Sequence, residues 1–588
     1  MPIVRWSLGH IFSYKETTLS DEIDPSALNA AQRDRDLERM STDVFDLVVI
    51  GGGVTGTGAA LDAATRGLSV ALVEQRDYAS GTSSRSSKLF HGGLRYLEQF
   101  NFGLVHEALA ERNLMLRSLC PHLARPVSFI YPLRHRVWER IYVGAGVFLY
   151  DVMAKRANSP LPRHEHLSRK DLATVAPALN IKKAHGAIRY WDAQVDDARH
   201  TMMLARTAAA HGAALGTSTK VMALGSAGDG RQVVEVLDLE TGRTLEIACR
   251  AVINATGVWS DGIQKLAGGE GLSVNASKGV HLVIPRSRID STTGMILRTP
   301  DSVLFIIPFD EHWIVGTTDT PWALRKPHPA ASQKDIDYLL KWVNSVLADP
   351  LGRDDVVGVY AGLRPLLTGE SDKTSKLSRE HAVIDNGKGL ISVAGGKYTT
   401  YRLMASDAVD ATATYFDQPL SPSRTTSVPL AGADGYEALR NGPSPTGIDS
   451  EDFHRLLGRY GSLVSKIADL IRDTPELGER LVGDAPYLKA ELVYAATHEG
   501  ALHLDDFLTR RTRFSIETRH RGTRALDEIT KLIAPLLGWD EETSAREIKH
   551  YRARIEAERD SQRQPDDHTA DAARMGAPDV RTGPTPSL

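Results

Sequence analysis

Three glycines and one acidic residue near the N-terminus have the spacing of a dinucleotide-binding turn. Gly51, Gly53 and Gly56 form the pattern G-x-G-x-x-G, and Glu74 follows the first of them by 74 − 51 = 23 residues. In such a turn the glycines allow a sharp bend and a close approach to a pyrophosphate, while the acid binds a ribose hydroxyl. These residue types at this spacing therefore predict that the chain binds a dinucleotide.

The elements that must position these residues flank the glycines on both sides. Residues 45–50 form a short apolar run rich in Val, an Ala-rich helical pattern follows the glycines, and a second Val-rich run ends at Glu74. This order is strand, tight turn, helix and strand. The free N–H groups at the start of the helix can hold an anion. Because all four elements agree, we favour dinucleotide binding over a glycine-rich structural turn.

A second group of polar residues follows directly. Residues 77–87 read DYASGTSSRSS, and small hydroxyl residues cannot build a core, so we expect a surface or cleft loop that hydrogen-bonds a ligand. An ordinary polar loop is the alternative. The next nine positions support the functional interpretation, because six of them carry residues suited to ligand binding: Lys88, His91, Gly92, Gly93, Arg95 and Tyr96. Among them, Arg95 offers a planar donor fork suited to phosphate.

Further candidates lie in the middle of the chain. His281 falls in a predicted strand (SKGVHLVIP), where a structural histidine with satisfied hydrogen bonds is the alternative to a functional one. Arg364 precedes a proline in VYAGLRPLL, and a guanidinium in so apolar a run either pairs with an acid or faces a cleft. The short strand in AVINATGVWSD ends at Gly257, where a ligand beside the strand would favour a small residue.

The segment LISVAGGKYTTYRLM repeats the pattern of strand, glycines and helix start. Gly396 is followed by Lys397, Thr399 and Thr400, and a helix N-terminus at this point can stabilise negative charge on a ligand. Lys397 adds a cation beside it.

Composition restricts the class of protein. At 588 residues the chain predicts more than one domain, and its hydrophobic content of 42% with 24% charged residues is ordinary for a soluble globular protein. The net charge of −4 does not point to nucleic acid. The two cysteines, Cys120 and Cys249, argue against a disulfide framework and a zinc site of paired cysteines, and no metal site is evident. We expect neither a signal peptide nor a spanning helix.

One apolar segment has basic flanks. Residues 134–156 read RHRVWERIYVGAGVFLYDVMAKR, which is too short to span a bilayer. The segment is either a buried core helix or a helix in the membrane interface, with aromatic residues buried and basic flanks on anionic lipid.

The pattern along the chain predicts five parts. Residues 1–42 form an N-terminal arm with a short helix that begins near Pro25 and is capped by Asp24. Residues 419–448, rich in Ser, Pro, Gly and Ala, form a linker, and amphipathic segments predict a helical domain. The predicted parts are residues 1–42 (arm), 43–418 (two interleaved domains), 419–448 (linker), 449–556 (helical domain) and 557–588 (disordered tail).

Several motifs in this order resemble the FAD-dependent, respiratory-type glycerol-3-phosphate dehydrogenases. They are GGGVTGTG, SSRSSKLFHGGLRYLE, NATGVW, KGVHLVIP, AGLRPLL, SVAGGKYTTYR and LVYAATHEGALHLDDFLTRRTR. The resemblance covers the chain from about residue 45 to about residue 556. It implies an α/β fold, namely a glutathione-reductase-like FAD-binding Rossmann domain with an antiparallel β substrate domain, plus a C-terminal all-α domain.

The resemblance also implies a reaction and a set of site residues. Members oxidise sn-glycerol 3-phosphate to dihydroxyacetone phosphate and pass the electrons to quinone, which implies a cytoplasmic protein peripherally associated with the inner face of the cell membrane. A homodimer is one alternative for the oligomeric state. By position in the motifs, the substrate pocket comprises Arg95, Tyr96, His281, Arg364, Lys397 and Thr400. The FAD environment comprises Gly51, Gly53, Gly56, Glu74, Ser86, Ser87, Gly257, Gly396 and Thr399.

For the mechanism, we expect FAD to take a hydride and His281 to accept the hydroxyl proton, since an imidazole with a pKa near 6.5 suits proton transfer at neutral pH. Arg364 could instead stabilise the developing alkoxide. The alternatives are an oxygen-dependent glycerol-3-phosphate oxidase, a flavoprotein acting on an amine or amino acid, and a non-catalytic FAD-binding protein.

Overall fold

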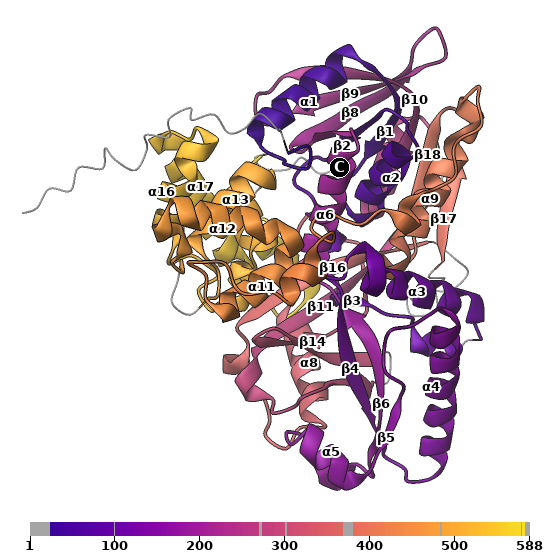
Figure 1. The fold of residues 1–588 in the computed structure, drawn as a ribbon, viewed down its shortest axis with the longest axis vertical. Helices are drawn as coiled ribbons and strands as arrows, with labels where there is room; N and C mark the ends of the chain where they lie inside the picture. Colours follow the sequence, from indigo (N-terminus) through magenta and orange to yellow (C-terminus); the bar gives the residue numbers. More distant parts are fainter. Residues whose placement is uncertain are drawn as a thin grey trace, which may run out of the picture.

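The computed structural model places two β-sheets side by side, with a helical C-terminal part against them (Figure 1). The residues that it describes are 24–98, 100–269, 273–299, 303–367, 380–481, 485–577 and 579–581.

The first sheet has a parallel centre built from distant parts of the chain. Its order is β17 (His381–Asp385), β18 (Leu390–Gly395), β10 (Thr244–Asn254), β1 (Val44–Ile50), β2 (Val70–Val73) and β7 (Ala214–Gly216). The five strands from β18 to β7 are parallel, and β8 (Thr219–Ser226) and β9 (Gln232–Asp238) extend from β10 as an antiparallel meander. The parallel strands therefore bring their carboxyl ends to one edge, where ligands of such sheets bind.

Helices cover both faces of this sheet. On one face, α2 (Val54–Thr65) packs against α6 (Asp197–Ala210) and α9 (Tyr401–Asp410). Small residues permit this close packing: a Cβ at Gly58 of α2 would lie 3.0 Å from the Tyr401 ring. The predicted strand, turn, helix and strand around the glycines are thus confirmed as β1, α2 and β2.

The N-terminal arm begins its helix later than expected. Helix α1 covers Ala30–Thr42, and the side chain of Asn29 caps it by accepting from the Gln32 N–H. Asp24 instead accepts from the backbone and hydroxyl of Ser26, so the expectation that Asp24 caps the helix is wrong. The side chains of Leu37 and Met40 are buried against the first sheet. Residues 1–23 of the predicted arm lie outside the described part of the chain.

The second sheet is antiparallel except between β4 and β12. Its order is β15 (Thr320–Trp322), β11 (Val274–Pro285), β14 (His312–Gly316), β13 (Val303–Phe309), β12 (Gly294–Arg298), β4 (Arg125–Pro132), β6 (Ala187–Gln194) and β3 (Leu89–Phe90). In addition, β16 (Gly358–Leu367) pairs with β11, and β5 (Glu165–Leu167) pairs with β6. Helix α8 (Gln333–Asn344) packs on this sheet, and α3 (Phe102–Leu114) packs against α4 (Trp138–Arg156). This confirms the expected antiparallel sheet; its role in binding substrate stays a prediction.

The C-terminal part is helical, as the periodicity predicts. Its principal helices are α11 (Ser450–Tyr460), α12 (Val464–Asp473), α13 (Lys489–His498), α16 (Leu526–Leu537) and α17 (Glu541–Ser561). Figure 1 shows them, orange to yellow, on one side of the two sheets. The placement of the domain boundaries stays a prediction.

The part of the tail up to residue 577 differs from the expected disorder, whereas residues 578 and 582–588 lie outside the described part of the chain. Helix α17 continues past residue 556, and α18 (Asp567–Arg574) follows, capped by Asp566. The physical reason is a buried ion pair: the Lys278 ammonium of β11 lies 2.5 Å from Asp567 and 2.6 Å from Asp335. A buried ammonium needs such partners, and composition alone does not reveal them.

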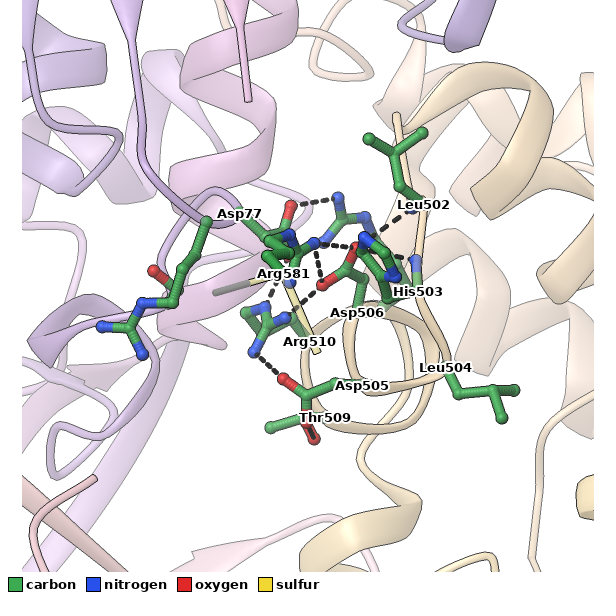
Figure 2. A network of polar contacts seen from close by, with 12 residues as sticks. Asp77, Leu502, His503, Leu504, Asp505, Asp506, Thr509, Arg510 and Arg581 are labelled. Atoms are coloured by element: carbon green, nitrogen blue, oxygen red, sulfur yellow. Dashed lines mark hydrogen bonds and ion pairs between the residues drawn. The ribbon is translucent and has the colours of Figure 1, made fainter. Parts of the chain in front are cut away.

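A network of buried ion pairs connects the C-terminal helices to the nucleotide-binding part. Figure 2 shows Asp77, three residues after Glu74, beside Arg510, with Asp506 and Arg581 in the same network. The Arg511 guanidinium donates to both Asp77 carboxylate oxygens, at 2.8 and 2.7 Å, and both side chains are about fully buried. Among the described residues, Asp77 is the one carboxylate within ion-pair distance of Arg511.

Replacing Asp77 with Asn is expected to destabilise the folded protein by about 3–5 kcal/mol, because it leaves the buried Arg511 charge without its carboxylate. Thermal unfolding followed by circular dichroism would show a large fall in the melting temperature. Asp473→Asn, in an exposed pair with Arg472, is the control and should change stability by less than about 1 kcal/mol. Equal melting temperatures for the two variants would contradict the role given to Asp77.

Candidate functional site

Three glycine-bearing turns meet at the carboxyl edge of the parallel sheet, after β1, β10 and β18. Gly51 has φ +111°, and a Cβ there would lie 2.8 Å from the Ala255 carbonyl oxygen. A Cβ at Gly56 would come within 1.9 Å of the Gly51 carbonyl oxygen, so only glycine lets α2 lie so near the turn. Gly53 is the N-cap residue of α2, and no side chain caps the helix from that position.

Glu74 follows β2 and turns its carboxylate to the first glycine turn. Oε2 accepts from the Gly52 N–H at 2.7 Å, and Oε1 accepts from the Arg76 N–H at 2.8 Å. The acid therefore lies beside the turn that would hold a pyrophosphate, as ribose binding in this fold requires.

The two later turns have backbone conformations suited to glycine. Gly257 and Gly396 have φ +59° and +73°. Thr399 is buried, and its Oγ1 accepts from the His91 N–H at 3.1 Å, so the third turn contacts the segment that follows β3. The turns after β1 and β10 are in such close contact that a Cβ at Gly51 would clash with the Ala255 backbone. Three glycine-bearing turns at one edge of the sheet, with Glu74 beside the first, fit FAD.

Ser86 and Ser87, which the resemblance places near FAD, contact other protein groups in the structure. The Ser86 N–H donates to Asp197 at 2.9 Å, and the Ser86 hydroxyl accepts from the Lys88 N–H at 2.9 Å. The Ser87 hydroxyl lies 2.9 Å from Nε2 of His281. Their assignment to the FAD environment stays a prediction, and Ser87 belongs to the His281 group.

His281 and Arg364 lie on the same face of the second sheet. In the antiparallel register of β11 and β16, His281 is opposite Tyr360 and Ser277 is opposite Arg364. Side chains two residues apart share a face, so His281, Tyr360 and Arg364 point the same way. His281 is 2% exposed, and its ring stacks on Tyr360 at 4.7 Å and 13°.

Two glycines on this face leave room for neighbouring groups. A Cβ at Gly279 would lie 2.6 Å from the Arg364 Nη2, and one at Gly362 would lie 2.5 Å from the Arg85 carbonyl oxygen. The Arg364 guanidinium donates to the Thr317 hydroxyl at 2.9 Å and lies 3.4 Å from Asp319. This contact orients a planar cation over the sheet, where it can bind a phosphate.

The pKa of His281 lies well below its ordinary value of 6.5, because burial disfavours the charged ring and the cations Arg364 and Lys88 repel it. This differs from the expectation of an imidazole near its unperturbed pKa. The physical reason is tertiary, since burial and both cations come from packing. A neutral imidazole can accept a proton, so the shift keeps His281 in the form that a general base needs.

The other predicted substrate residues form a second group. The Lys397 ammonium lies 3.9 Å from the centre of the Tyr96 ring. Thr400 is 3% exposed, and its hydroxyl donates to the Lys397 carbonyl oxygen at 3.3 Å. The backbone of Arg95 lies in a short 3₁₀ helix, whereas its side chain is outside the described part of the structure.

A single segment of ten residues connects the two groups. Ser87 at its start contacts His281, and Tyr96 at its end contacts Lys397. The structure therefore brings the predicted substrate residues to the two ends of one short segment, which contains β3 of the second sheet.

Sequence reasoning missed Tyr360 and left Lys88 without a role. Tyr360 is four residues before Arg364, and the period of two along a strand could have placed both on one face. Lys88 is 2% exposed and pairs with the buried Asp197 of α6, which no sequence pattern connects to it.

Comparisons with known proteins agree with this geometry. Residues 46–402 match the family model of the FAD dependent oxidoreductases, and residues 423–544 match that of the C-terminal domain of alpha-glycerophosphate oxidase. The chain is similar to a glycerol-3-phosphate dehydrogenase of Mycobacterium leprae, at 54% identity over 95% of this chain and 96% of the relative. It is also similar to the human mitochondrial glycerol-3-phosphate dehydrogenase, at 36% identity over 86% of this chain and 72% of the relative.

Solved structures show the same fold. The Bacillus halodurans glycerol-3-phosphate dehydrogenase complexed with FAD has 29% identity and a TM-score of 0.73, covering 90% of this chain and 98% of that one. The FAD-bound L-alpha-glycerophosphate oxidase of Mycoplasma pneumoniae, at 16% identity and a TM-score of 0.52, covers 66% of this chain and 99% of its own and shares the fold.

Proposed function

The chain belongs to the FAD-dependent glycerol-3-phosphate dehydrogenases, and from this premise we propose that it oxidises sn-glycerol 3-phosphate at the His281 face and passes the electrons to a membrane quinone. The observation that carries the site is the placement of His281 and Arg364 on one face of the second sheet, with the imidazole held neutral.

The chain's own residues bind the substrate and move its proton. Arg364 and Lys397, together with Arg95 from the sequence motif, supply the cations that a phosphate dianion needs. His281 accepts the proton of the secondary hydroxyl as the carbonyl of dihydroxyacetone phosphate forms. Bound FAD supplies the hydride acceptor for this chemistry. Gly51, Gly53, Gly56 and Glu74 hold the cofactor.

An anaerobic experiment tests both half-reactions. Adding sn-glycerol 3-phosphate to the purified holoenzyme should bleach the flavin band at about 450 nm, and adding a soluble quinone should restore it. A flavin that stays oxidised would refute the substrate assignment. Rapid reoxidation by oxygen and slow reoxidation by quinone would refute the acceptor and favour an oxidase.

Helix α4 is the surface that supports membrane association. Its buried face carries Gly144, Val147 and Tyr150, so the core-helix alternative accounts for one side only. The other side turns large apolar residues to solvent, with exposed fractions of 60% at Trp138, 67% at Ile141, 54% at Tyr142, 60% at Phe148 and 39% at Leu149. No helix in the described ranges is long and apolar enough to cross a bilayer.

This arrangement fits a helix that lies in the membrane interface. The exposed apolar residues recur at helical spacing, and exposed basic residues flank them at Arg134, Arg136, Lys155 and Arg156. We therefore propose that the protein works at the inner face of the cell membrane, as a cytoplasmic peripheral protein, where quinone is available. A homodimer stays a prediction.

A triple variant, Trp138→Ser, Ile141→Ser and Phe148→Ser, is expected to lose binding to vesicles that contain anionic lipid, because it removes most of the apolar area that would enter the interface. Flotation assays measure the binding. Reduction of a soluble acceptor by sn-glycerol 3-phosphate should stay unchanged. The control carries three serines at Met222, Ile384 and Leu536, which are exposed by 40%, 41% and 38% elsewhere. Equal vesicle binding by the two variants would exclude α4 as the docking surface.

A further inference from the structure

Two residues outside the expected substrate pocket contact the His281 imidazole, one at a ring nitrogen and one at the ring face. The Ser87 hydroxyl lies within hydrogen-bond distance of Nε2, at 2.9 Å. Tyr360 stacks on the ring at 4.7 Å, and its own hydroxyl donates to the Ser86 carbonyl oxygen at 3.0 Å. Tyr360 therefore connects the ring to the loop that carries Ser87.

Gly316 lies against the Cδ2 edge of the ring. It pairs with His281 across β11 and β14, and a Cβ there would lie 2.3 Å from Cδ2 of His281. Any larger residue would displace the ring. The imidazole is thus confined between a stacked aromatic ring, a glycine backbone and a hydroxyl.

The two ring nitrogens of His281 differ in their partners. Nε2 has the Ser87 hydroxyl, whereas Nδ1 is buried and has no hydrogen-bond partner among the described residues. A buried polar atom without a partner is unfavourable, and at a functional site it marks a position for a ligand. A neutral imidazole carries one N–H, so the partner of one nitrogen decides the state of the other.

We propose that Ser87 and Tyr360 are positioning residues, which fix His281 with the proton on Nε2, donated to the Ser87 hydroxyl, and leave Nδ1 as the atom that accepts the substrate proton. This inference rests on the proposed function and names the atom and the supports that the function needs.

The charged groups around the ring agree with this assignment. Arg364 faces it from β16 and Lys88 from the loop beside Ser87, and both cations disfavour an imidazolium. Asp197 of α6 pairs with Lys88, and Asp319 after β14 lies beside Arg364, so each carboxylate is held by a cation. The ring is therefore neutral before the reaction, and the position of its single proton is what Ser87 controls.

The proton balance is complete. The substrate O–H bond breaks and the proton forms a new N–H bond at Nδ1, which makes the imidazolium. FAD, when bound, would supply the acceptor for the hydride that leaves the carbon. The carbonyl double bond forms, and the Nε2 proton stays on the ring. Ser87 then accepts a hydrogen bond from a charged donor, which is stronger than one from a neutral donor.

Replacing Ser87 with Ala tests the inference by single-turnover flavin reduction without oxygen. We expect the limiting reduction rate to fall at least about tenfold, within the range of one lost hydrogen bond to a charged group, while the Kd of sn-glycerol 3-phosphate changes less than about threefold. Ser87→Thr keeps the hydroxyl and should restore most of the rate. The matched control is Ser84→Ala in the same loop, whose hydroxyl makes no hydrogen bond to His281.

Tyr360 has its own pair of variants. Tyr360→Phe keeps the stacked ring and should retain most of the rate, whereas Tyr360→Leu removes the stacking and should lose about as much as Ser87→Ala. Rates are measured per bound flavin, so the limiting reduction rate can be determined even for a variant that retains little FAD. Ser87→Cys, which offers a weaker acceptor of similar size, serves if the Ala variant does not fold.

Several outcomes would overturn the inference. One is a Ser87→Ala rate equal to that of Ser84→Ala; another is a raised Kd with an unchanged limiting rate, which would make Ser87 a substrate ligand. A Thr variant as slow as the Ala variant would also reject the hydroxyl's role. Failure of the proposed function is distinguishable, because the wild-type flavin would then stay oxidised with substrate.

Discussion

The His281→Ala variant is expected to reduce its flavin about 10²–10⁴ times more slowly than the wild type with sn-glycerol 3-phosphate, because it lacks the general base. The Kd of the substrate should change little, since the phosphate is bound by cations elsewhere. Rapid mixing without oxygen separates the two quantities, as the limiting rate and the half-saturating concentration. An unchanged limiting rate would remove His281 from the mechanism.

The pH dependence gives an independent check on the same residue. His281 acts as a base only when neutral, and burial together with Arg364 and Lys88 lowers its pKa well below 6.5. The limiting rate constant for flavin reduction, measured with saturating substrate, should therefore be flat from neutral pH upward and fall only in acid, as the pH drops through the lowered pKa. Saturation is needed because the phosphate of the free substrate itself titrates at about pH 6. His211→Ala, at an exposed histidine that ends α6, is the control and should match the wild type. A fall centred at or above pH 6.5 would contradict the assignment.

Replacing Arg364 with Ala is expected to weaken substrate binding by about 10–100-fold and also to slow flavin reduction. The loss of binding follows from removing a charge-assisted contact to phosphate, which is worth about 1.5–3 kcal/mol. Arg364→Lys should be intermediate, because it keeps the charge and loses the planar fork.

Glycerol, which lacks the phosphate, separates the two roles of Arg364. If the guanidinium binds phosphate, the variant should lose much of its preference for sn-glycerol 3-phosphate over glycerol, while oxidation of glycerol itself changes less. Arg353→Ala, at an exposed arginine paired with Asp337, is the control. Normal binding of sn-glycerol 3-phosphate by Arg364→Ala would refute its assignment as a phosphate ligand.

Local chemistry explains why the nucleotide-binding part could be predicted. The tasks of Gly56 and Glu74 depend on neighbours within about two dozen residues, so the spacing in the sequence already contains the turn, the helix and the acid. The close approach of Ala255 to Gly51 is a tertiary contact. The same holds for the helical periodicity of residues 449–556. By contrast, the helix start at Asn29 rather than Asp24 depended on which of two nearby polar residues capped it, and α18 depended on an ion pair with the distant Lys278.

The sequence by itself determined the dinucleotide turn, the class of fold, and His281 and Arg364 as residues of interest. Only the tertiary structure decided their chemistry. The register of β11 and β16 placed His281 on Tyr360 and on the same face as Arg364, and a loop from another part of the chain brought Ser87 to the imidazole. Burial, stacking and the field of distant cations arise from contacts between residues far apart in the chain, and these contacts set the protonation of a side chain whose identity the sequence already contains.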